Sequence, residues 1–277
     1  MPCLVIKVRT EKTWLENMET KGGTLKTRAK ISGVVIAYND APNIRTCLES
    51  LHWVDELIVI DSHSTDGTTE ICQEFTPHVF HYPFHGFGAL RNHALTHASN
   101  DWIFSLDTDE IATREIQEEI ESLLTHGPSA HAYFVPRRNH FLGRAIKHCG
   151  WYPDYRQPQF FHKTFMRYRE DLVHEGYELD GTVGYLHSHV EQTPFRDLAQ
   201  FWHKMDRYST LRAKAMHGEG RTFRIHQVIS HPLFTFFKMY IWRMGLLDRK
   251  QGLILSLLYA CYTFMKYAKL WELQRKV

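Results

Sequence analysis

Hydrophobic and polar positions alternate along the first half of the chain in a way that predicts strands and helices in turn. Short apolar runs at residues 31–38, 57–60 and 102–106 are typical of strands buried on both faces. Apolar residues at helical spacing predict helices after Asn39 and after the polar turn 61–68. Successive strand–helix units indicate a parallel sheet with right-handed crossovers. We therefore expect an α/β fold that binds its ligand beyond the carboxyl ends of the strands.

Polar side chains follow three of the predicted strands, namely Asn39, Asp61 and Asp107. In an extended chain Asp109 lies on the same side as Asp107, and two adjacent carboxylates repel unless a cation lies between them. Mg²⁺ usually takes one or two carboxylates together with substrate phosphates. The alternative is a polar turn in which Asp109 or Thr113 caps the next helix. The expected meeting of all these groups at one sheet edge favours a ligand site.

Two further polar segments are open to two interpretations each. Asp66 either contributes to the same site or only caps the helix that follows it. Gly86 and Gly88 precede a predicted helix that carries Arg91. Glycines permit close approach of the backbone, and a helix N-terminus beside an arginine favours an anion. Two glycines before a helix are common, so this signal is weak alone.

Between residues 132 and 180 the pattern changes to aromatic and basic residues. Such residues suit a site that binds sugars on aromatic faces and phosphates through guanidinium groups, although many aromatics belong equally well in a core. The residues are Arg137, Arg138, Arg144, Lys147, Trp151, Tyr152, Tyr155 and Arg156. His174-Glu175 lacks the second histidine of the zinc-protease helix motif. Glu175 is therefore a candidate general base, or a surface residue beside a turn.

The last third of the chain predicts amphipathic helices at residues 195–217, from His231-Pro232 onward, and at 248–273. The uncharged stretch 251–265 is too short to span a membrane. Apolar faces beside many Lys and Arg residues are typical of helices that lie in an anionic membrane surface. The competing interpretation is that these helices pack on the catalytic domain or on a second copy of the chain.

Composition and charge complete the picture. A chain of 277 residues with 43% hydrophobic and 23% charged residues is typical of a globular protein. Five scattered cysteines indicate neither disulfides nor a zinc site, which fits a reducing cytosol, and no signal peptide is visible. Residues 30–194 contain 12 Lys/Arg and 23 Asp/Glu, whereas residues 195–277 contain 15 and 5. We expect a flexible extension at 1–29, an acidic catalytic domain at 30–194, and a basic, membrane-associating helical extension at 195–277.

Taken together, the ordered motifs resemble those of family 2 glycosyltransferases of the GT-A fold, in particular the glucosyltransferases of lipopolysaccharide core assembly. The likeness covers about residues 30–270. The matching segments are 34–39, 58–68, 86–92, 106–110, 173–175 and 204–209. The family often has Gly in place of His63 and Arg-Leu-Phe in place of Pro158-Gln159-Phe160.

The resemblance implies an inverting, metal-dependent transfer of a hexose from a nucleotide-sugar donor such as UDP-glucose to a lipopolysaccharide inner-core or related glycolipid acceptor. It implies that Asp61 binds the nucleobase in a pocket shaped by Tyr38 and Asn39, and that Arg91 steadies the nucleotide. Asp107 would reach the ribose or the metal. Asp109 would bind Mg²⁺ or Mn²⁺, with His189 as a further metal ligand. Glu175 would take a proton from the acceptor hydroxyl. The expected location is the cytoplasmic face of the inner membrane, where the protein would be peripheral. Both a monomer and a homo-oligomer fit this expectation.

Other functions fit less well. A polyprenyl-phosphate acceptor and a non-catalytic, membrane-associated carbohydrate-binding protein are the alternatives that stay open. A nucleotidyltransferase would need a basic phosphate loop after the first strand, where this chain has Asn39-Asp40-Ala41-Pro42. The acidic catalytic domain argues against a nucleic-acid partner.

Overall fold

The structure, a computed structural model, describes residues 28–170 and 176–275. The extension predicted for residues 1–29 therefore lies almost entirely outside the described residues. The chain divides into two compact units. The first comprises Tyr155–Val190 and the described part of Met1–Pro136, and the second comprises Arg137–Asp154 and the described part of Glu191–Val277. The segment Arg137–Asp154, which the sequence assigned to the catalytic domain, thus groups with the C-terminal helices.

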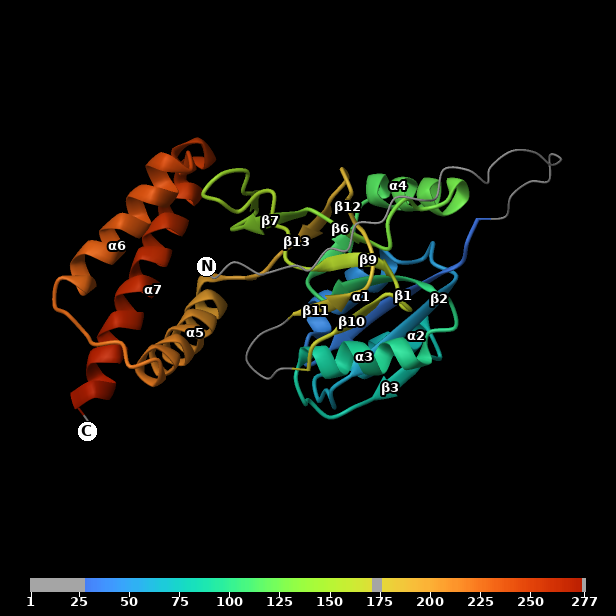
Figure 1. The fold of residues 1–277 in the computed structure, drawn as a ribbon, viewed down its shortest axis with the longest axis horizontal. Coiled ribbons are helices and arrows are strands. Elements are labelled where there is room, and N and C mark those ends of the chain that lie inside the picture. Colours follow the sequence, from blue (N-terminus) through green and yellow to red (C-terminus); the bar gives the residue numbers. More distant parts are fainter. Residues whose placement is uncertain (1–27, 171–175, 276–277) are drawn as a thin grey trace. The chain divides into compact units, whose positions relative to one another are not determined.

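A seven-stranded sheet forms the centre of the first unit (Figure 1). Its strand order is β12-β6-β9-β4-β1-β2-β3, and most neighbouring strands are parallel. Only β9 runs against its neighbours β4 and β6. The strands are β1 (Ile31–Ala37), β2 (Glu56–Asp61), β3 (Val79–His81), β4 (Trp102–Asp107), β6 (Ala132–Phe134), β9 (Pro158–His162) and β12 (Val183–Tyr185). The predicted α/β fold with a mostly parallel sheet is confirmed.

Helices cover both faces of this sheet because each strand alternates buried side chains between two apolar clusters. On one face lie α1 (Ala41–Glu49), α2 (Thr68–Phe75) and α4 (Arg114–His126), which pack through Ile44, Cys72 and Ile116 among others. The other face packs against α3 (Phe87–His97) and the hairpin β10–β11 (Met166–Tyr168 and Tyr177–Leu179). Figure 1 shows α3, β10 and β11 together. The sheet is therefore buried between α1, α2 and α4 on one face and α3 with the β10–β11 hairpin on the other.

The second unit is mostly helical, as predicted. Strands β7 (Arg137–Phe141) and β8 (Arg144–Ala145) form a hairpin. It also contains α5 (Leu198–Gly218), α6 (Gln227–Phe237), the π-helical turn η1 (Lys238–Trp242), the 3₁₀ turn η2 (Gly245–Asp248) and α7 (Arg249–Arg275). Helix α6 begins before the predicted start, so Pro232 lies inside it. Asp248 ties η2 to the segment after β8, because its carboxylate accepts the backbone N–H groups of Lys147 and His148.

Among the helices of the described residues, none is both long and apolar enough to cross a membrane.

The core of the first unit generates a stability prediction. Phe160 is fully buried, with its ring stacked on those of Trp102 and Tyr133 at centroid distances of 4.8 and 5.4 Å. Phe160→Ala is expected to reduce the free energy of unfolding by about 3–5 kcal/mol, because it leaves a cavity in the sheet core. Urea denaturation followed by circular dichroism measures this loss. Phe84→Ala, at a position 53% exposed, is the control and should cost less than about 1 kcal/mol. Equal losses in the two variants would contradict the assignment of this core.

Candidate active site

The strand register brings the predicted site residues of three strands to one edge of the sheet. Strand β1 pairs in parallel with both β2 and β4, so Ala37 lies beside Asp61 and Ile36 lies beside Asp107. Tyr38 and Asn39 follow directly after β1. Because parallel strands end at the same edge, these residues lie at one edge, as the sequence predicted. The Asp61 side chain contacts Thr69 of α2 on one face, and the Asp107 side chain contacts Arg91 of α3 on the other. Tyr38 is 64% exposed and offers a ring face to solvent.

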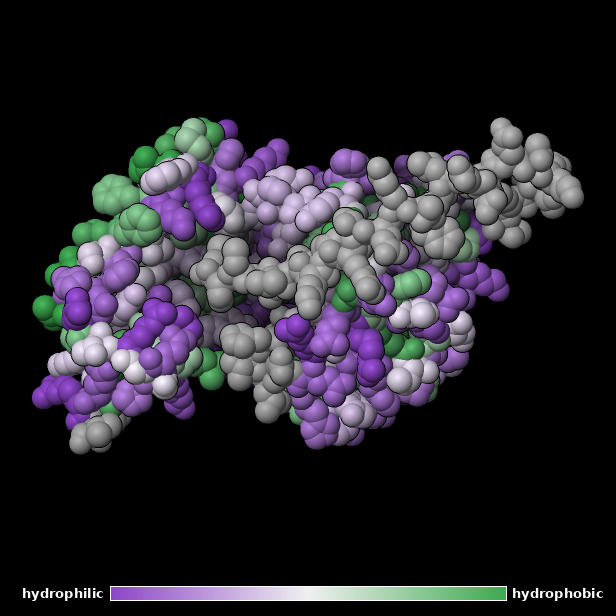
Figure 2. Space-filling view, in the orientation of Figure 1, coloured by the Kyte–Doolittle hydropathy of each residue, from purple (hydrophilic) through white to green (hydrophobic). Residues whose placement is uncertain are grey.

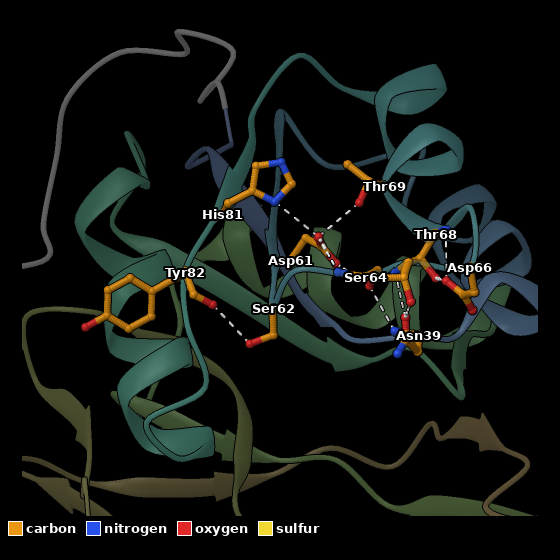
Figure 3. A network of polar contacts seen from close by, with 10 residues as sticks. Asn39, Asp61, Ser62, Ser64, Asp66, Thr68, Thr69, His81 and Tyr82 are labelled. Atoms are coloured by element: carbon orange, nitrogen blue, oxygen red, sulfur yellow. Dashed lines mark hydrogen bonds and ion pairs between the residues drawn. The ribbon is translucent and has the colours of Figure 1, made fainter.

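Asp61 organises the turn that follows β2 (Figure 3). Its carboxylate is fully buried and accepts hydrogen bonds from the N–H and hydroxyl of Ser64 and from the Thr69 hydroxyl (2.9 Å). The Nδ1 atom of His81 lies 3.2 Å away. A nucleobase that binds Asp61 must therefore exchange one of these bonds. The nucleobase contact of Asp61 stays a prediction.

Asn39 joins the loop after β1 to the same turn. The side-chain oxygen of Asn39 accepts the backbone N–H of Thr65 at 2.8 Å. The backbone N–H of Asn39 donates to the Ser64 hydroxyl at 2.9 Å. His63, where the family often has glycine, has a φ of +61°, a conformation that favours glycine. Its ring stacks on that of His81 at 5.6 Å. The turn is thus fixed by side-chain bonds on both sides.

Asp66 bridges the N-termini of α1 and α2, as its capping interpretation predicts. Its carboxylate accepts the backbone N–H groups of Ala41 and Thr68, each at 3.1 Å. The hydroxyl of Thr68 also donates to it, and this bond lowers the pKa of Asp66 from its ordinary value. The carboxylate is therefore held in its charged form beside two helix N-termini.

The buried Arg91 on α3 forms an ion pair with the partly exposed Asp107 at the end of β4. The guanidinium Nη2 lies 2.7 Å from Asp107 Oδ1, and the Arg91 residue is only 4% exposed. The guanidinium also lies 5.4 Å from the ring centroid of Tyr168 on β10. Arg91 therefore neutralises part of the acidic edge and fixes the direction of the Asp107 side chain.

Glu110 differs in role from the two aspartates that precede it. Its side chain is fully buried and accepts the Asp107 N–H at 2.9 Å and the Gln159 side-chain amide at 2.7 Å. These bonds hold the turn after β4 against β9. Sequence reasoning did not separate Glu110 from Asp107 and Asp109, and its structural role depends on a residue 49 positions away.

Asp109 lies in this turn and is partly exposed. Burial raises the pKa of the nearby Cys47 thiol well above its usual value, and the charges of Glu110, Asp109 and Asp107 raise it further. Cys47 donates to the backbone carbonyl of Asp107 at 3.4 Å. The Cys47 side chain therefore lies against the backbone at the end of β4, directly before the turn that carries Asp109.

Comparison with known families identifies the group of proteins to which this site belongs. The model of the family described as "Glycosyl transferase family 2" matches residues 32–193, more than half of the chain. The chain belongs to glycosyl transferase family 2. The GT-A fold and the glycosyltransferase activity that the motifs predicted are thereby confirmed. The matched segment includes both carboxylates of the turn after β4.

Similar proteins include the lipopolysaccharide core biosynthesis glycosyltransferase LpsC of Rhizobium meliloti, 29% identical over 87% of this chain and 92% of the relative. An uncharacterized glycosyltransferase of Rickettsia felis is 25% identical over 88% and 90%. Among solved structures, S. aureus TarS 1–349 in complex with UDP-GlcNAc is similar over 90% of this chain and 92% of that chain, with 15% identity and a TM-score of 0.45.

Asp107 and Asp109 of this family 2 glycosyltransferase suit a divalent ion that arrives with a diphosphate. Carboxylate oxygens are the ligands that Mg²⁺ and Mn²⁺ prefer, and Mg²⁺ usually takes only one or two of them. Within residues 28–170 and 176–275, no group of three or more His, Cys, Asp or Glu side chains is arranged to hold a metal ion. Two carboxylates are the number of protein ligands that Mg²⁺ usually takes beside substrate phosphates, so the chemistry of this donor pair fits such an ion.

The two other predicted site residues, Glu175 and His189, both stay predictions. Glu175 lies outside the described residues, so its role stays a prediction. The residues flanking it are anchored, because the N–H of Arg169 donates to the carbonyl of Gly176 at 2.9 Å. The backbone carbonyl of His189 accepts the Thr113 hydroxyl at 2.8 Å, at the start of α4. His189 as a metal ligand also stays a prediction.

Asn92 is a site-supporting residue that sequence reasoning did not single out. Its side chain donates to the Tyr168 carbonyl at 2.8 Å and accepts the Tyr168 N–H at 3.0 Å, which ties β10 to α3. Gly88 permits this close approach, because a Cβ there would lie 1.9 Å from the Arg169 carbonyl oxygen. The hairpin that leads into the Glu175 segment is thus fixed beside Arg91. The signals in the sequence were the two glycines before the helix and the family-like segment 86–92, which contains Asn92.

The contrast between Glu110 and Asp109 generates the next prediction. Glu110→Ala is expected to reduce the free energy of unfolding by about 2–3 kcal/mol, because the Asp107 N–H and the Gln159 amide lose a buried acceptor. Asp109→Asn, a partly exposed and nearly isosteric change, should cost less than about 1 kcal/mol. Urea denaturation of both variants measures the difference. If Asp109→Asn were the more destabilising of the two, the structural role assigned to Glu110 would be wrong.

Proposed function

We propose that this family 2 glycosyltransferase transfers a hexose with inversion, glucose from UDP-glucose, to a lipopolysaccharide inner-core or related glycolipid acceptor. The observation that carries the proposal is the meeting of Asp61 and Asp107 at one sheet edge in a chain of this family. The similarity to LpsC along nearly the whole of both chains supports the acceptor class. A polyprenyl-phosphate acceptor is the alternative, because it shares the membrane setting.

Each residue of the edge has a distinct role in this proposal. Tyr38, Asn39 and Asp61 bind the nucleoside, and Arg91 keeps Asp107 oriented toward the diphosphate. Asp107 and Asp109 hold Mg²⁺ or Mn²⁺, with His189 as a further candidate. When bound, the metal stabilises the negative charge that grows on the departing diphosphate.

Glu175 takes the proton from the acceptor hydroxyl in the proposed reaction. That hydroxyl then attacks the anomeric carbon from the face opposite the leaving group, which inverts the configuration. The described residues before and after the segment that contains Glu175 form strands β10 and β11, and Asn92 fixes β10 on α3.

The metal-binding role of Asp109 can be tested by substitution. Asp109→Asn is expected to lower transfer from UDP-glucose at least about 100-fold, because the variant loses a metal ligand but keeps its fold. Release of UDP in the presence of a core-lipid acceptor and Mg²⁺ or Mn²⁺ is the measurement. Removal of the metal with EDTA should abolish the wild-type rate, and added Mn²⁺ should restore it.

The matched variant is Glu175→Gln, which should lose transfer while its affinity for UDP-glucose, measured by calorimetry, is unchanged. Full turnover by Asp109→Asn would exclude the metal assignment, and a normal rate for Glu175→Gln would exclude the base. Binding of sugar without any need for nucleotide would favour the non-catalytic alternative.

A glycolipid acceptor requires access to a membrane surface, and we assign that contact to α6 and η1. No residue of α6 is buried, and Trp242 at the end of η1 is 80% exposed. Figure 2 shows apolar side chains along the outer edge of α6. The exposed apolar side chains are Ile229, Leu233, Phe234, Phe237, Ile241, Trp242, Met244, Leu246 and Leu247.

The charges around this apolar face have one sign. Between Arg221 and Lys266 the chain carries seven Lys or Arg residues, and Asp248 is its only acidic residue. Asp248 is buried and bonded to the segment after β8, so it does not offset the exposed Lys238, Arg243, Arg249 and Lys250. The apolar side chains match the hydrophobic part of a lipid surface, and the basic side chains around them match its anionic headgroups.

Vesicle binding tests this assignment. The double variant Phe237→Ser/Trp242→Ser is expected to bind phosphatidylglycerol-containing vesicles at least about tenfold more weakly than the wild type, because it loses the apolar part of the contact. Arg249→Gln/Lys250→Gln should weaken the binding at low salt only. Co-sedimentation measures both effects, with Trp202→Ser on α5, 42% exposed, as the control. Unchanged binding by the double variant, or a dimer that this variant dissociates, would contradict membrane attachment through α6.

A further inference from the structure

A cluster of aromatic rings lies at the end of the sheet opposite β3, and the proposed chemistry does not use it. The rings of Phe134 on β6 and Tyr185 on β12 stack at a centroid distance of 5.2 Å and an interplanar angle of 17°. Tyr155 meets Tyr185 edge-on at 5.3 Å, and Tyr177 at the start of β11 meets Phe134 edge-on at 6.1 Å. We call Phe134, Tyr155, Tyr177 and Tyr185 the aromatic cluster.

Sheet register places this cluster at the same edge as Asp107. Phe104 of β4 pairs with Phe160 of β9, and Phe134 pairs with Pro158, two residues earlier on β9. Because β9 runs antiparallel to both strands, Phe134 lies toward the carboxyl end of β4. Tyr185 pairs with Phe134 on the outermost strand. Two to three strand spacings separate these rings from β4, a distance of roughly 10–14 Å.

The cluster also lies on the sheet face that carries the Glu175 hairpin. Tyr133 is buried on the face with α1, α2 and α4, so its neighbour Phe134 points to the opposite face, where β10 and β11 pack. Tyr177 follows Glu175 by only two residues. Burial raises the pKa of the Tyr177 phenol, and Tyr185 raises it further.

The exposure of the rings argues against a purely structural role. Tyr185 is 57% exposed and Tyr155 is 39% exposed, and neither belongs to the buried clusters of the first unit. Gly184 lets β12 approach β6 closely, because a Cβ there would lie 2.6 Å from the Tyr133 ring. The backbone is therefore built so that an accessible tyrosine stacks on Phe134.

We propose that the aromatic cluster binds a sugar ring of the acceptor, one that lies beside the sugar whose hydroxyl reacts. Sugar rings present apolar C–H faces that stack on aromatic rings, while phenol hydroxyls bond to sugar hydroxyls. The inference rests on the proposed function, since it assumes that the acceptor carries sugar residues. The distance between the aromatic cluster and β4 suits a contact with a sugar ring that does not itself react. The cluster then sets which acceptor is used without touching the donor.

Substitution of the exposed tyrosines tests this inference in the full-length protein. Tyr185→Ala and Tyr155→Ala are each expected to weaken binding of a deacylated inner-core oligosaccharide about tenfold and to raise the acceptor KM by the same factor. UDP affinity and donor KM should stay within about twofold. Tyr185→Phe keeps the ring and should lose less than about threefold. Saturation-transfer NMR and calorimetry measure the oligosaccharide and UDP separately.

Val183→Ala is the matched control, because Val183 lies on the same face of β12 and is 38% exposed. Unchanged oligosaccharide affinity in Tyr185→Ala, an equal loss in Val183→Ala, or a parallel loss of UDP affinity would each overturn the inference. A wild type that binds UDP-glucose but no inner-core oligosaccharide would overturn it as well. A wild type that binds neither UDP nor UDP-glucose would instead refute the proposed function.

Discussion

The parallel pairing of β1 with both β2 and β4 is the constraint on which the site depends. This single register sets Asp61 and Asp107 level with the end of β1, although 46 positions separate them in the chain. A slip of one residue would turn each side chain to the other face of the sheet. All seven residues of β1 are buried, and their side chains oppose such a slip because it would exchange the two apolar clusters. The chemistry at the edge is therefore held in place by the core beneath it.

Gathering acidic groups at one edge creates repulsion that the fold must offset. The structure does so with a different partner for each carboxylate. Asp107 has the guanidinium of Arg91, Asp66 has two helix N-termini, and Asp61 has the donors of Ser64 and Thr69. Glu110 is buried against the amide of Gln159. Asp109 remains partly exposed at this edge, which is consistent with its proposed role toward a metal. In the proposed reaction, neutralisation by the protein and binding of a cation would thus be divided among neighbouring residues.

The sequence allowed the strands, the helices and the meeting of the aspartates to be predicted, because apolar periodicity and parallel topology depend on local pattern. The sequence did not allow the different roles of neighbouring acidic residues, such as Asp109 and Glu110, to be predicted. Glu110 is structural only because Gln159 reaches it from a strand whose pairing no local pattern indicates. The segment Arg137–Asp154 groups with the C-terminal helices through Asp248, a contact about 100 positions away. The exposure of Tyr185 likewise follows from Gly184 and Tyr133 meeting across two strands. Tertiary contacts of this kind produce no periodic pattern in the amino-acid sequence, so they could not be predicted from it.

The charge asymmetry of the chain acquires a physical meaning once the two units are considered separately. If the only role of the basic residues were electrostatic attraction to the acidic first unit, they could lie anywhere on the second unit. Instead, Lys238, Arg243, Arg249 and Lys250 border a face rich in exposed apolar side chains, where pairing with an acidic protein surface would leave those side chains in water. The acidic residues of α5 and of the loop after it are already engaged, since Asp206 pairs with Lys269 and Glu219 pairs with Arg212 and Arg221. A lipid surface satisfies the apolar and the basic groups at the same time. The segregation of charge therefore supports a division of labour in which one unit carries the chemistry and the other brings it to the membrane.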